Sequence, residues 1–265
     1  MSGRPQIAGI VLVRDEDLHL ERALRNVVEF CDVIHVADHQ STDRTPEILA
    51  RLAAEFPKIT VRRITDPRES NALLQAYAST PTWVFGVDGD EIYDPAGLAK
   101  LRTQLHDGRF DEWWVVFGNV LNCVDIDLER RTATGYLAPP CRSMTKLYNF
   151  RMLRSLDPTA PQRLHSHKGR DEFHPPYHPL LRCDLYKETA WDDAEFRCLH
   201  ACFLPRSSRE ATGAPRENVS ESLQPMRRLR RIAQRLIGRQ AASDYKRDKY
   251  MRGPRVTVDA RPFFP

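Results

Sequence analysis

The sequence predicts an α/β protein with a mainly parallel central sheet and helices on both faces. Over the first 110 residues, short β-branched apolar runs alternate with segments in which apolar residues recur at helical spacing. Such alternation is typical of parallel sheets, because a helix must carry the chain back before the next strand can pair in parallel. Polar residues follow three of the expected strands, and in parallel sheets these strand ends share the edge at which ligands bind.

The expected elements follow one another closely. Ile7–Val13 is a β-branched run that predicts the first strand, and Leu18–Phe30 places leucine, alanine and valine at helical spacing. A further helix is expected to start at Thr45, because proline follows it at the first helical position. The other elements expected in this half are strands at Val33–Ala37, Ile59–Ile64 and Thr82–Val87 and a short helix at Ser70–Ala78.

The second half is less periodic. Trp113–Leu121 is a long apolar run that predicts one more strand of the sheet, whereas residues 155–195 are rich in histidine, proline and acids. Long polar loops of this kind are often functional. We therefore expect an α/β half at residues 1–110, a smaller half of the same domain at 111–222, and a basic helix with an extended tail at 223–265.

Composition excludes several classes of protein. The 265 residues carry a net charge of +4, and 41% of them are hydrophobic, which is ordinary for a globular domain. No apolar stretch approaches the roughly 20 residues that span a bilayer, and the N-terminus predicts a strand rather than a secretion signal. Six scattered cysteines are too few for a disulfide scaffold, so we expect reduced thiols and a cytoplasmic protein.

The basic charge is local. Residues 223–239 hold six arginines and no acid, and without them the chain would have a slight negative charge, so we expect no nucleic-acid partner. Apolar residues recur in this segment every three or four positions, which predicts an amphipathic helix. Three interpretations remain open: the helix packs on the core, it lies on an anionic membrane at the inner face, or its arginines bind phosphates of a ligand.

An apolar strand, Thr82–Val87, ends directly in three carboxylates, Asp88, Asp90 and Glu91. Burying such charges is costly unless a cation compensates them. Gly89 is expected to let the backbone turn so that the aspartates face one spot. Mg²⁺ and Mn²⁺ prefer oxygen ligands and keep positions open for phosphate oxygens. An acidic surface turn is the alternative interpretation of this motif taken alone.

Two other strand ends are also acidic. The first expected strand ends before Asp15 and Glu16, and the second ends in Asp38, which Ser41 and Asp43 follow. Like charges repel, so three acidic loops at one edge are hard to explain as stabilising features. The chain contains no G-x-G and no G-x-x-x-x-G-K sequence, which excludes the glycine-based dinucleotide and P-loop sites. A bound nucleotide would therefore need a metal to hold its phosphates.

These motifs resemble those of the family 2 glycosyltransferases, which have the GT-A fold. The resemblance rests on their order and spacing and covers residues 5–110 well; Lys146–Arg151 and Leu199–His200 resemble later landmarks of the family. The motifs are IVLVRDE at 10–16, VADHQSTDRT at 36–45 and DGDE at 88–91. The family usually has asparagine at Arg14 or Asp15, and aspartate or glycine at His39 and Gln40.

The resemblance implies a role for each matching residue. Asp15 or Glu16 would lie near the nucleobase or ribose, and Asp38 would contact the uracil or ribose of the donor. Asp90 would be the main protein ligand of Mn²⁺ or Mg²⁺, and His200 would be a further ligand of the metal or phosphate. Asp88 would contact the ribose or the water shell of the metal. The other residues that the resemblance places at the donor are Val13, Ser41, Arg68 and Gly89.

The resemblance implies a metal-dependent transferase that moves a sugar from a nucleotide donor to an unknown acceptor. The sugar is expected to be a hexosyl or N-acetylhexosaminyl group, and the donor is expected to be UDP-linked. The resemblance also implies inversion at the anomeric carbon. Asp171 and Glu172, placed by their distance after Asp90 in the family layout, are the candidates for the general base, which must deprotonate the acceptor. The alternative is that they are solvated acids of a loop. A nucleotidyltransferase and a catalytically inactive nucleotide-sugar-binding protein are the alternatives. Peripheral membrane contact through 223–239 and a homodimer are partner hypotheses.

A structural zinc site is the rival interpretation of the second half. Its histidines and cysteines are suitable zinc ligands, but no C-x-x-C pair occurs and the spacings match no common zinc module. Buried cysteines also occur as small apolar residues, without any ligand. The residues concerned are His165, His167, His174, His178, Cys183, Cys198, His200 and Cys202.

Overall fold

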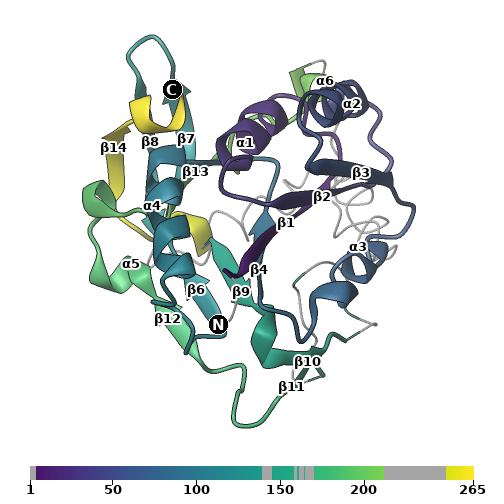
Figure 1. Cartoon of the computed structure of the whole chain (residues 1–265). Coiled ribbons are helices and arrows are strands. Elements are labelled where there is room, and N and C mark those ends of the chain that lie inside the picture. The colour runs from purple at the N-terminus through teal and green to yellow at the C-terminus, as the bar shows by residue number, and fades with distance from the viewer. Residues whose placement is uncertain (1–3, 139–144, 158–159, 161–163, 165–169, 212–248) are drawn as a thin grey trace, which may run out of the picture.

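The computed structural model describes residues 4–138, 145–157, 160, 164, 170–211 and 249–265 (Figure 1). Within them, seven strands form a central sheet in the order β12-β6-β9-β4-β1-β2-β3. Strands β1 to β4 run parallel to one another, whereas β9 is antiparallel to both β4 and β6. The strands are β1 (Gln6–Val13), β2 (Val33–Asp38), β3 (Ile59–Arg63), β4 (Thr82–Val87), β6 (Val115–Phe117), β9 (Lys146–Asn149) and β12 (Arg182–Asp184). The predicted mainly parallel sheet is confirmed.

Helices cover both faces of this sheet, as predicted. Val11 and Phe85 point to the face covered by α1 (Leu20–Val27), α2 (Thr45–Glu55) and α4 (Pro95–His106). Their neighbours Ile10 and Val84 point to the other face, because successive strand residues alternate. There they meet Leu74, which lies between α3 (Glu69–Ala72) and the 3-10 helix η1 (Gln75–Tyr77). The segment predicted as one helix at Ser70–Ala78 is therefore two short turns.

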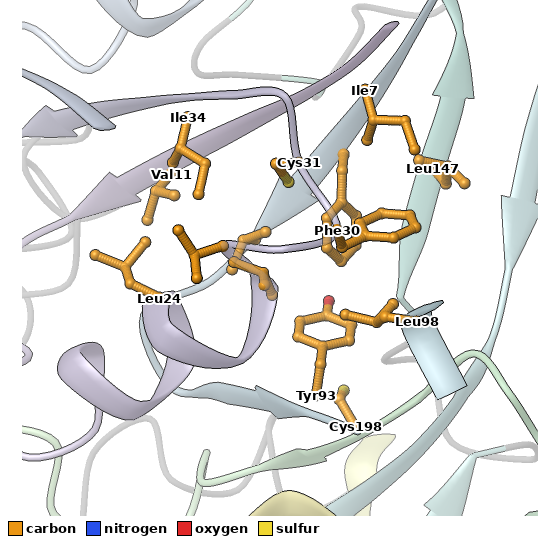
Figure 2. Close-up of a cluster of buried hydrophobic side chains, with 14 of the residues drawn as sticks. Ile7, Val11, Leu24, Phe30, Cys31, Ile34, Tyr93, Leu98, Leu147 and Cys198 are labelled. Atoms are coloured by element: carbon orange, nitrogen blue, oxygen red, sulfur yellow. The ribbon is translucent and has the colours of Figure 1, made fainter. Parts of the chain in front are cut away.

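The larger core cluster holds α1 and the strands together (Figure 2). The ring of Phe85 meets Phe30 and Tyr93 edge-on, with centroids 5.2 Å and 4.9 Å away. Edge-to-face pairs of this kind add about 0.5–1.5 kcal/mol to the stabilisation that burial provides. Tyr93 comes from β5 (Glu91–Tyr93), which directly follows the acidic motif. This core therefore fixes the far end of the segment that carries Asp88 and Asp90.

A second sheet of five strands lies beside the first, in the order β14-β8-β7-β13-β5. Strand β13 is antiparallel to β5, and this register sets His200 opposite Glu91. The acidic motif thus connects the central sheet to the second sheet. The other strands of this second sheet are β7 (Asn119–Asp127), β8 (Thr132–Ala138), β13 (Arg197–His200) and β14 (Arg255–Asp259).

The expectation of one strand over Trp113–Leu121 is wrong in one respect. The segment does extend the central sheet through β6, but it then divides at Gly118 and continues as β7 in the second sheet. A Cβ atom at Gly118 would lie 2.1 Å from the carbonyl oxygen of Phe196, so only glycine allows the chain to cross at this point. Strands β6, β9 and β12 come from residues 111–222 and share the central sheet with β1 to β4 of residues 1–110.

The remaining elements are short. β10 (Leu153–Ser155) pairs with β11 (Glu172–Phe173), and β14 brings the C-terminal tail onto β8 in extended form. The basic segment 223–239 lies outside the described residues. Within the described part of the chain, no helix is long and apolar enough to cross a membrane. The other helices are α5 (Leu185–Glu188), α6 (Ser208–Ala211), and the 3-10 helices η2 (Phe150–Met152), η3 (Trp191–Asp193) and η4 (Arg261–Phe263).

Candidate functional site

The loops after β1 and β2 are fastened to each other at the carboxyl edge of the sheet. Asp15 adopts a left-handed backbone conformation, with φ of 51°. Its Oδ1 atom accepts hydrogen bonds from the backbone N–H groups of Thr42, at 2.6 Å, and Asp43, at 3.2 Å. Its own backbone N–H donates to Ser41 Oγ at 3.0 Å. Left-handed backbone costs a non-glycine residue free energy, and these bonds to the neighbouring loop offset it.

Asp38 and Ser41 continue this network below the surface. The backbone N–H of Ser41 donates to Asp38 Oδ1 at 3.0 Å, and both residues are buried. The backbone N–H of Glu16 donates to Thr45 Oγ1 at 2.9 Å, which ties the first loop to the start of α2. The sequence prediction that Asp15, Glu16, Asp38 and Ser41 gather at one edge is thus met by contacts between two loops.

The acidic corner, which we define as Glu16, Asp88 and Asp90, lies where the β1 and β4 loops meet. Asp90 is 2% exposed, and its Oδ2 atom lies 3.0 Å from Nη1 of Arg206 and 3.6 Å from Nε2 of His200. Arg206 Nη1 also lies 3.6 Å from Glu16 Oε1. One guanidinium therefore neutralises carboxylates from two different loops.

Arg206 remains a cation in this setting. Burial alone would lower the pKa of its guanidinium, but Asp90 and Glu16 more than offset this effect and raise the pKa above its usual value. A buried carboxylate without such a partner would instead tend to take up a proton. Arg206 thus keeps the corner charged and compact, and it comes from a segment after β13 that no short motif in the sequence identified.

His200 is oriented by a second buried side chain. Its Nδ1 atom lies 2.9 Å from Oδ1 of Asn122, a residue of β7 that is fully buried. Because an amide oxygen can only accept, Nδ1 carries a proton, and Nε2 is the ring nitrogen that faces Asp90. Support of this kind from a neighbouring acceptor is what fixes the tautomer of histidines that bind metals. Sequence reasoning identified His200 but not Asn122, which lies 78 residues earlier in the chain.

Glu91 points away from this edge into the core. Its Oε2 atom accepts a hydrogen bond from the hydroxyl of Tyr93 at 2.6 Å. Burial, helped by the negative charge of Asp88, raises the pKa of Glu91 to about 8. The raised pKa favours the protonated, neutral form, and the side chain acts as a structural support beneath the motif, while Asp90 faces the basic side chains.

Gly89 is required for space and not for its backbone freedom. It does not adopt a positive φ, in contrast to Gly108. A Cβ atom at position 89 would lie 2.3 Å from Glu16 Oε2 and 3.1 Å from Cγ1 of Val13. The glycine therefore lets the β1 loop approach the acidic motif closely, and the expectation of a special turn conformation is corrected.

Comparison with known proteins agrees with this geometry. The family model described as "Glycosyl transferase family 2" matches residues 10–173. The chain belongs to this family. The α/β architecture and the acidic motif after β4 are those that the resemblance to the GT-A fold led us to expect. No curated protein matches the chain.

Two solved structures illustrate how distant the similarity is. Glucosyl-3-phosphoglycerate synthase from Mycobacterium tuberculosis, solved with Mn²⁺, UDP and glucosyl-3-phosphoglycerate, is 17% identical, with 60% of this chain and 61% of that chain covered and a TM-score of 0.39. A mannosyltransferase from Pyrobaculum calidifontis, solved with GDP-mannose and Mn²⁺, is 16% identical, with 80% and 60% covered and a TM-score of 0.43. The chain therefore spans about 60% of the length of each.

The other residues predicted for the donor side lie around the same edge in this family 2 protein. Val13 is the last residue of β1, and its carbonyl oxygen accepts the backbone N–H of His39 at 2.9 Å. Arg68 lies after β3, where its guanidinium pairs with Asp66 at the surface. Their contacts with a donor stay predictions.

Asp171 and Glu172, the candidates for the general base, are not brought to the acidic corner. Strand β9 runs back along β4, and its end at Asn149 pairs with Trp83, at the amino end of β4. The pair β10 and β11 follows there, at the opposite end of the molecule from α6 (Figure 1). Since β4 spans six residues, the two ends of the sheet are roughly 15–20 Å apart.

Each of these two acids has a local partner. Glu172 is exposed, and its carboxylate lies 3.0 Å from Nη2 of Arg154, which lowers its pKa. Asp171 Oδ1 accepts the backbone N–H of Asp157 at 2.9 Å. Asp171 also lines a small cavity of about 70 Å³ with Asn71 and aromatic side chains.

The zinc interpretation gains no support from the described residues. Among them, no group of three or more histidine, cysteine, aspartate or glutamate side chains is arranged to hold a metal ion by itself. His165 and His167 lie outside the described part of the chain. The five described cysteines are buried and not in disulfides, as expected for small apolar side chains: Cys31, Cys123, Cys183, Cys198 and Cys202.

Proposed function

We propose that this family 2 protein is a metal-dependent glycosyltransferase that moves a sugar from a nucleoside diphosphate donor to an acceptor hydroxyl. The observation that carries the proposal is the convergence of Asp90 Oδ2 and His200 Nε2, 3.6 Å apart, at the carboxyl edge of the sheet. A carboxylate and an imidazole held this close, both nearly buried, are an incomplete but suitable ligand pair for a divalent cation.

The residues present fit such an ion. Carboxylate oxygens and imidazole nitrogens lie about 2.0–2.2 Å from a bound divalent metal, so two ligands 3.6 Å apart can contact one ion. Imidazole suits Mn²⁺ better than Mg²⁺, which makes Mn²⁺ the better candidate. Since no three described side chains form a closed site, the remaining positions would be filled by water and by the oxygens of a diphosphate.

The donor would lie across the ends of β1, β2 and β4. Asp15, Asp38 and Ser41 are fixed there by the contacts between the two loops, so a nucleoside would meet a rigid edge. We take the donor to be a UDP-sugar and the transfer to be inverting, and both choices rest on the sequence resemblance alone. When bound, the metal would supply Lewis-acid stabilisation of the diphosphate leaving group. Asp90 and His200 would hold that ion, with Asn122 keeping the imidazole in the required tautomer.

The proposal is tested by donor binding and hydrolysis. UDP with Mn²⁺ should raise the melting temperature of the protein, and UDP-, GDP- and dTDP-sugars should be compared for slow metal-dependent hydrolysis. Loss of both signals in His200→Ala, with the fold retained by circular dichroism, would support the assignment. The absence of any shift with every nucleotide would refute it, whereas binding without turnover on a broad acceptor panel would favour an inactive binding protein.

A further inference from the structure

A short segment after β13 is fastened across the loops of the candidate site. This segment, residues 205–209, is called the strap below. Its polar contacts join it to the β1 and β2 loops and to the acidic corner. Those with the two loops are Pro205 O to His19 Nε2 (2.9 Å), Leu18 N to Arg206 O (3.1 Å), Ser207 Oγ to Asp43 Oδ2 (2.7 Å), Ser208 N and Oγ to Asp17 (2.7 and 2.5 Å), and Arg209 to Thr42.

Asp17 is the main attachment point of the strap. Its two carboxylate oxygens receive separate hydrogen bonds, one from the backbone N–H and one from the hydroxyl of Ser208. Hydrogen bonds to a charged acceptor are stronger than neutral ones. Asp17 itself lies outside the acidic corner, so the fastening of the strap can be altered without touching Asp90 or His200.

The strap carries Arg206 into the acidic corner. The guanidinium is 15% exposed and lies within 3.0 Å of Asp90 Oδ2, the same oxygen atom that faces His200. A divalent cation bound by Asp90 and His200 would therefore be in contact with Arg206. Two positive groups cannot share one oxygen atom at this distance in a partly desolvated site without strong repulsion. Cation binding at Oδ2 therefore competes with this position of Arg206.

We propose that the strap closes the acidic corner in the cation-free protein, with Arg206 as the resident positive charge that the divalent ion replaces. Binding of the ion then requires the strap to release Arg206 from Asp90. The inference rests on the proposed function, because it takes Asp90 and His200 as the cation ligands. It adds that the affinity for the cation is set by the contacts of Asp17 and Ser208, which touch neither the cation nor the donor.

The test measures the affinity for Mn²⁺ without nucleotide, from the electron paramagnetic resonance signal of the free ion. Ser208→Ala removes one fastening bond without changing charge, and Asp17→Asn weakens both. A looser strap competes less for Asp90, so we expect about tenfold tighter Mn²⁺ binding in Asp17→Asn and a smaller gain in Ser208→Ala. The sign for Asp17→Asn is diagnostic, since losing a negative charge near the site would by itself weaken cation binding.

Matched controls come from the far end of the sheet. Ser155→Ala removes the hydroxyl that donates to Glu172, and Asp111→Asn removes the charge that pairs with Arg151. Both variants should bind Mn²⁺ with the wild-type affinity. Hydrogen exchange gives a second measurement: the backbone N–H groups of Leu18 and Ser208, bonded to or within the strap, should lose protection when Mn²⁺ and UDP bind.

The outcomes separate the two proposals. Equal or weaker Mn²⁺ binding in Asp17→Asn and Ser208→Ala, or unchanged exchange on loading, would overturn the strap while leaving the transferase intact. No Mn²⁺ binding by any variant, even with saturating UDP, would overturn the proposed function and the strap together. Circular dichroism and thermal melts of each variant identify any loss of fold.

Discussion

The two ends of the central sheet both carry carboxylates, but they treat them differently. At the carboxyl edge, Asp90 is buried and contacts two basic side chains. His200 comes from β13 of the second sheet, and Arg206 comes from the segment that follows this strand. At the amino end, Glu172 is exposed and pairs with Arg154 of the adjacent strand. Exposed pairs contribute little to stability, whereas breaking a buried pair is costly. The difference shows that burial and long-range partners, more than acidity, distinguish the candidate site.

The largest effect should come from Asp90→Asn. The amide keeps the shape of the side chain but is a poor ligand for a divalent cation, so we expect metal-dependent donor hydrolysis to fall at least about 100-fold. Mn²⁺ should no longer enhance the thermal shift by UDP. Hydrolysis rates and thermal melts of the wild type and the variant measure these effects. Full activity of the variant would show that the buried carboxylate at the carboxyl edge is no more important than the exposed one at the amino end.

Gly89→Ala tests whether the close approach of the two loops matters. The new Cβ would lie 2.3 Å from Glu16 Oε2 and 3.1 Å from Val13 Cγ1, so the Glu16 carboxylate must move away from the acidic motif. We expect a loss of about 1–3 kcal/mol in the free energy of unfolding, as is usual for overpacking, together with weaker binding of UDP and Mn²⁺. Gly108→Ala is the matched control: its positive φ makes it destabilising as well, but it lies at the end of α4 and should leave UDP binding unchanged.

Glu91→Gln tests whether the buried Glu91 side chain is protonated in the folded, metal-free protein. The folded-state pKa of about 8 lies above the ordinary value of 4.5. Between these values the folded protein keeps a proton that the unfolded chain releases, so stability falls as pH rises through this window. Glutamine cannot ionise, and we therefore expect the variant to be nearly as stable as the wild type near pH 5 and more stable than it by roughly 3–5 kcal/mol near pH 8.

Denaturant titrations of both proteins at several pH values measure this difference. Parallel pH profiles would show that Glu91 is ionised in the folded protein, which would contradict its role as a neutral support.

The smallest effect should come from Glu172→Gln. Its carboxylate is exposed and its partner is a surface arginine, so we expect the melting temperature and the rate of donor hydrolysis to remain unchanged. A large loss of transferase activity with normal donor hydrolysis would instead restore Glu172 as a base acting on the acceptor, in a conformation that brings the two ends together.

Much of the fold could be predicted from local patterns. The strands β1, β2 and β4 are apolar runs that end in polar residues, and parallel pairing brings such ends together wherever the intervening helices pack. Asp90 and His200 were identified because a family motif marks them. The division at Gly118 could not be predicted, because the reason for it is the carbonyl group of Phe196, a residue far along the chain.

The partners of the site residues are the part that sequence reasoning missed. Arg206 lies 116 residues after Asp90, and no spacing rule connects the two. Asp171 and Glu172 were assigned by their distance along the chain, but β9 reverses direction and carries the following residues to the other end of the sheet. Position along the chain predicts which strand end a residue follows only while the strands remain parallel.

The backbone pairing between β5 and β13 has a consequence for how the protein could change over time. Glu91 pairs with His200 across the ladder, and the backbone N–H of Ala201 donates to the carbonyl oxygen of Asp90 at 2.8 Å. Main-chain hydrogen bonds therefore fix the backbone positions of Asp90 and His200, the two cation-facing residues. The segments on the far side of the molecule, which belong to neither strand, could be exchanged or lengthened without altering these positions. Under the proposed function, acceptor specificity could thus change while the residues that bind the cation stay in place.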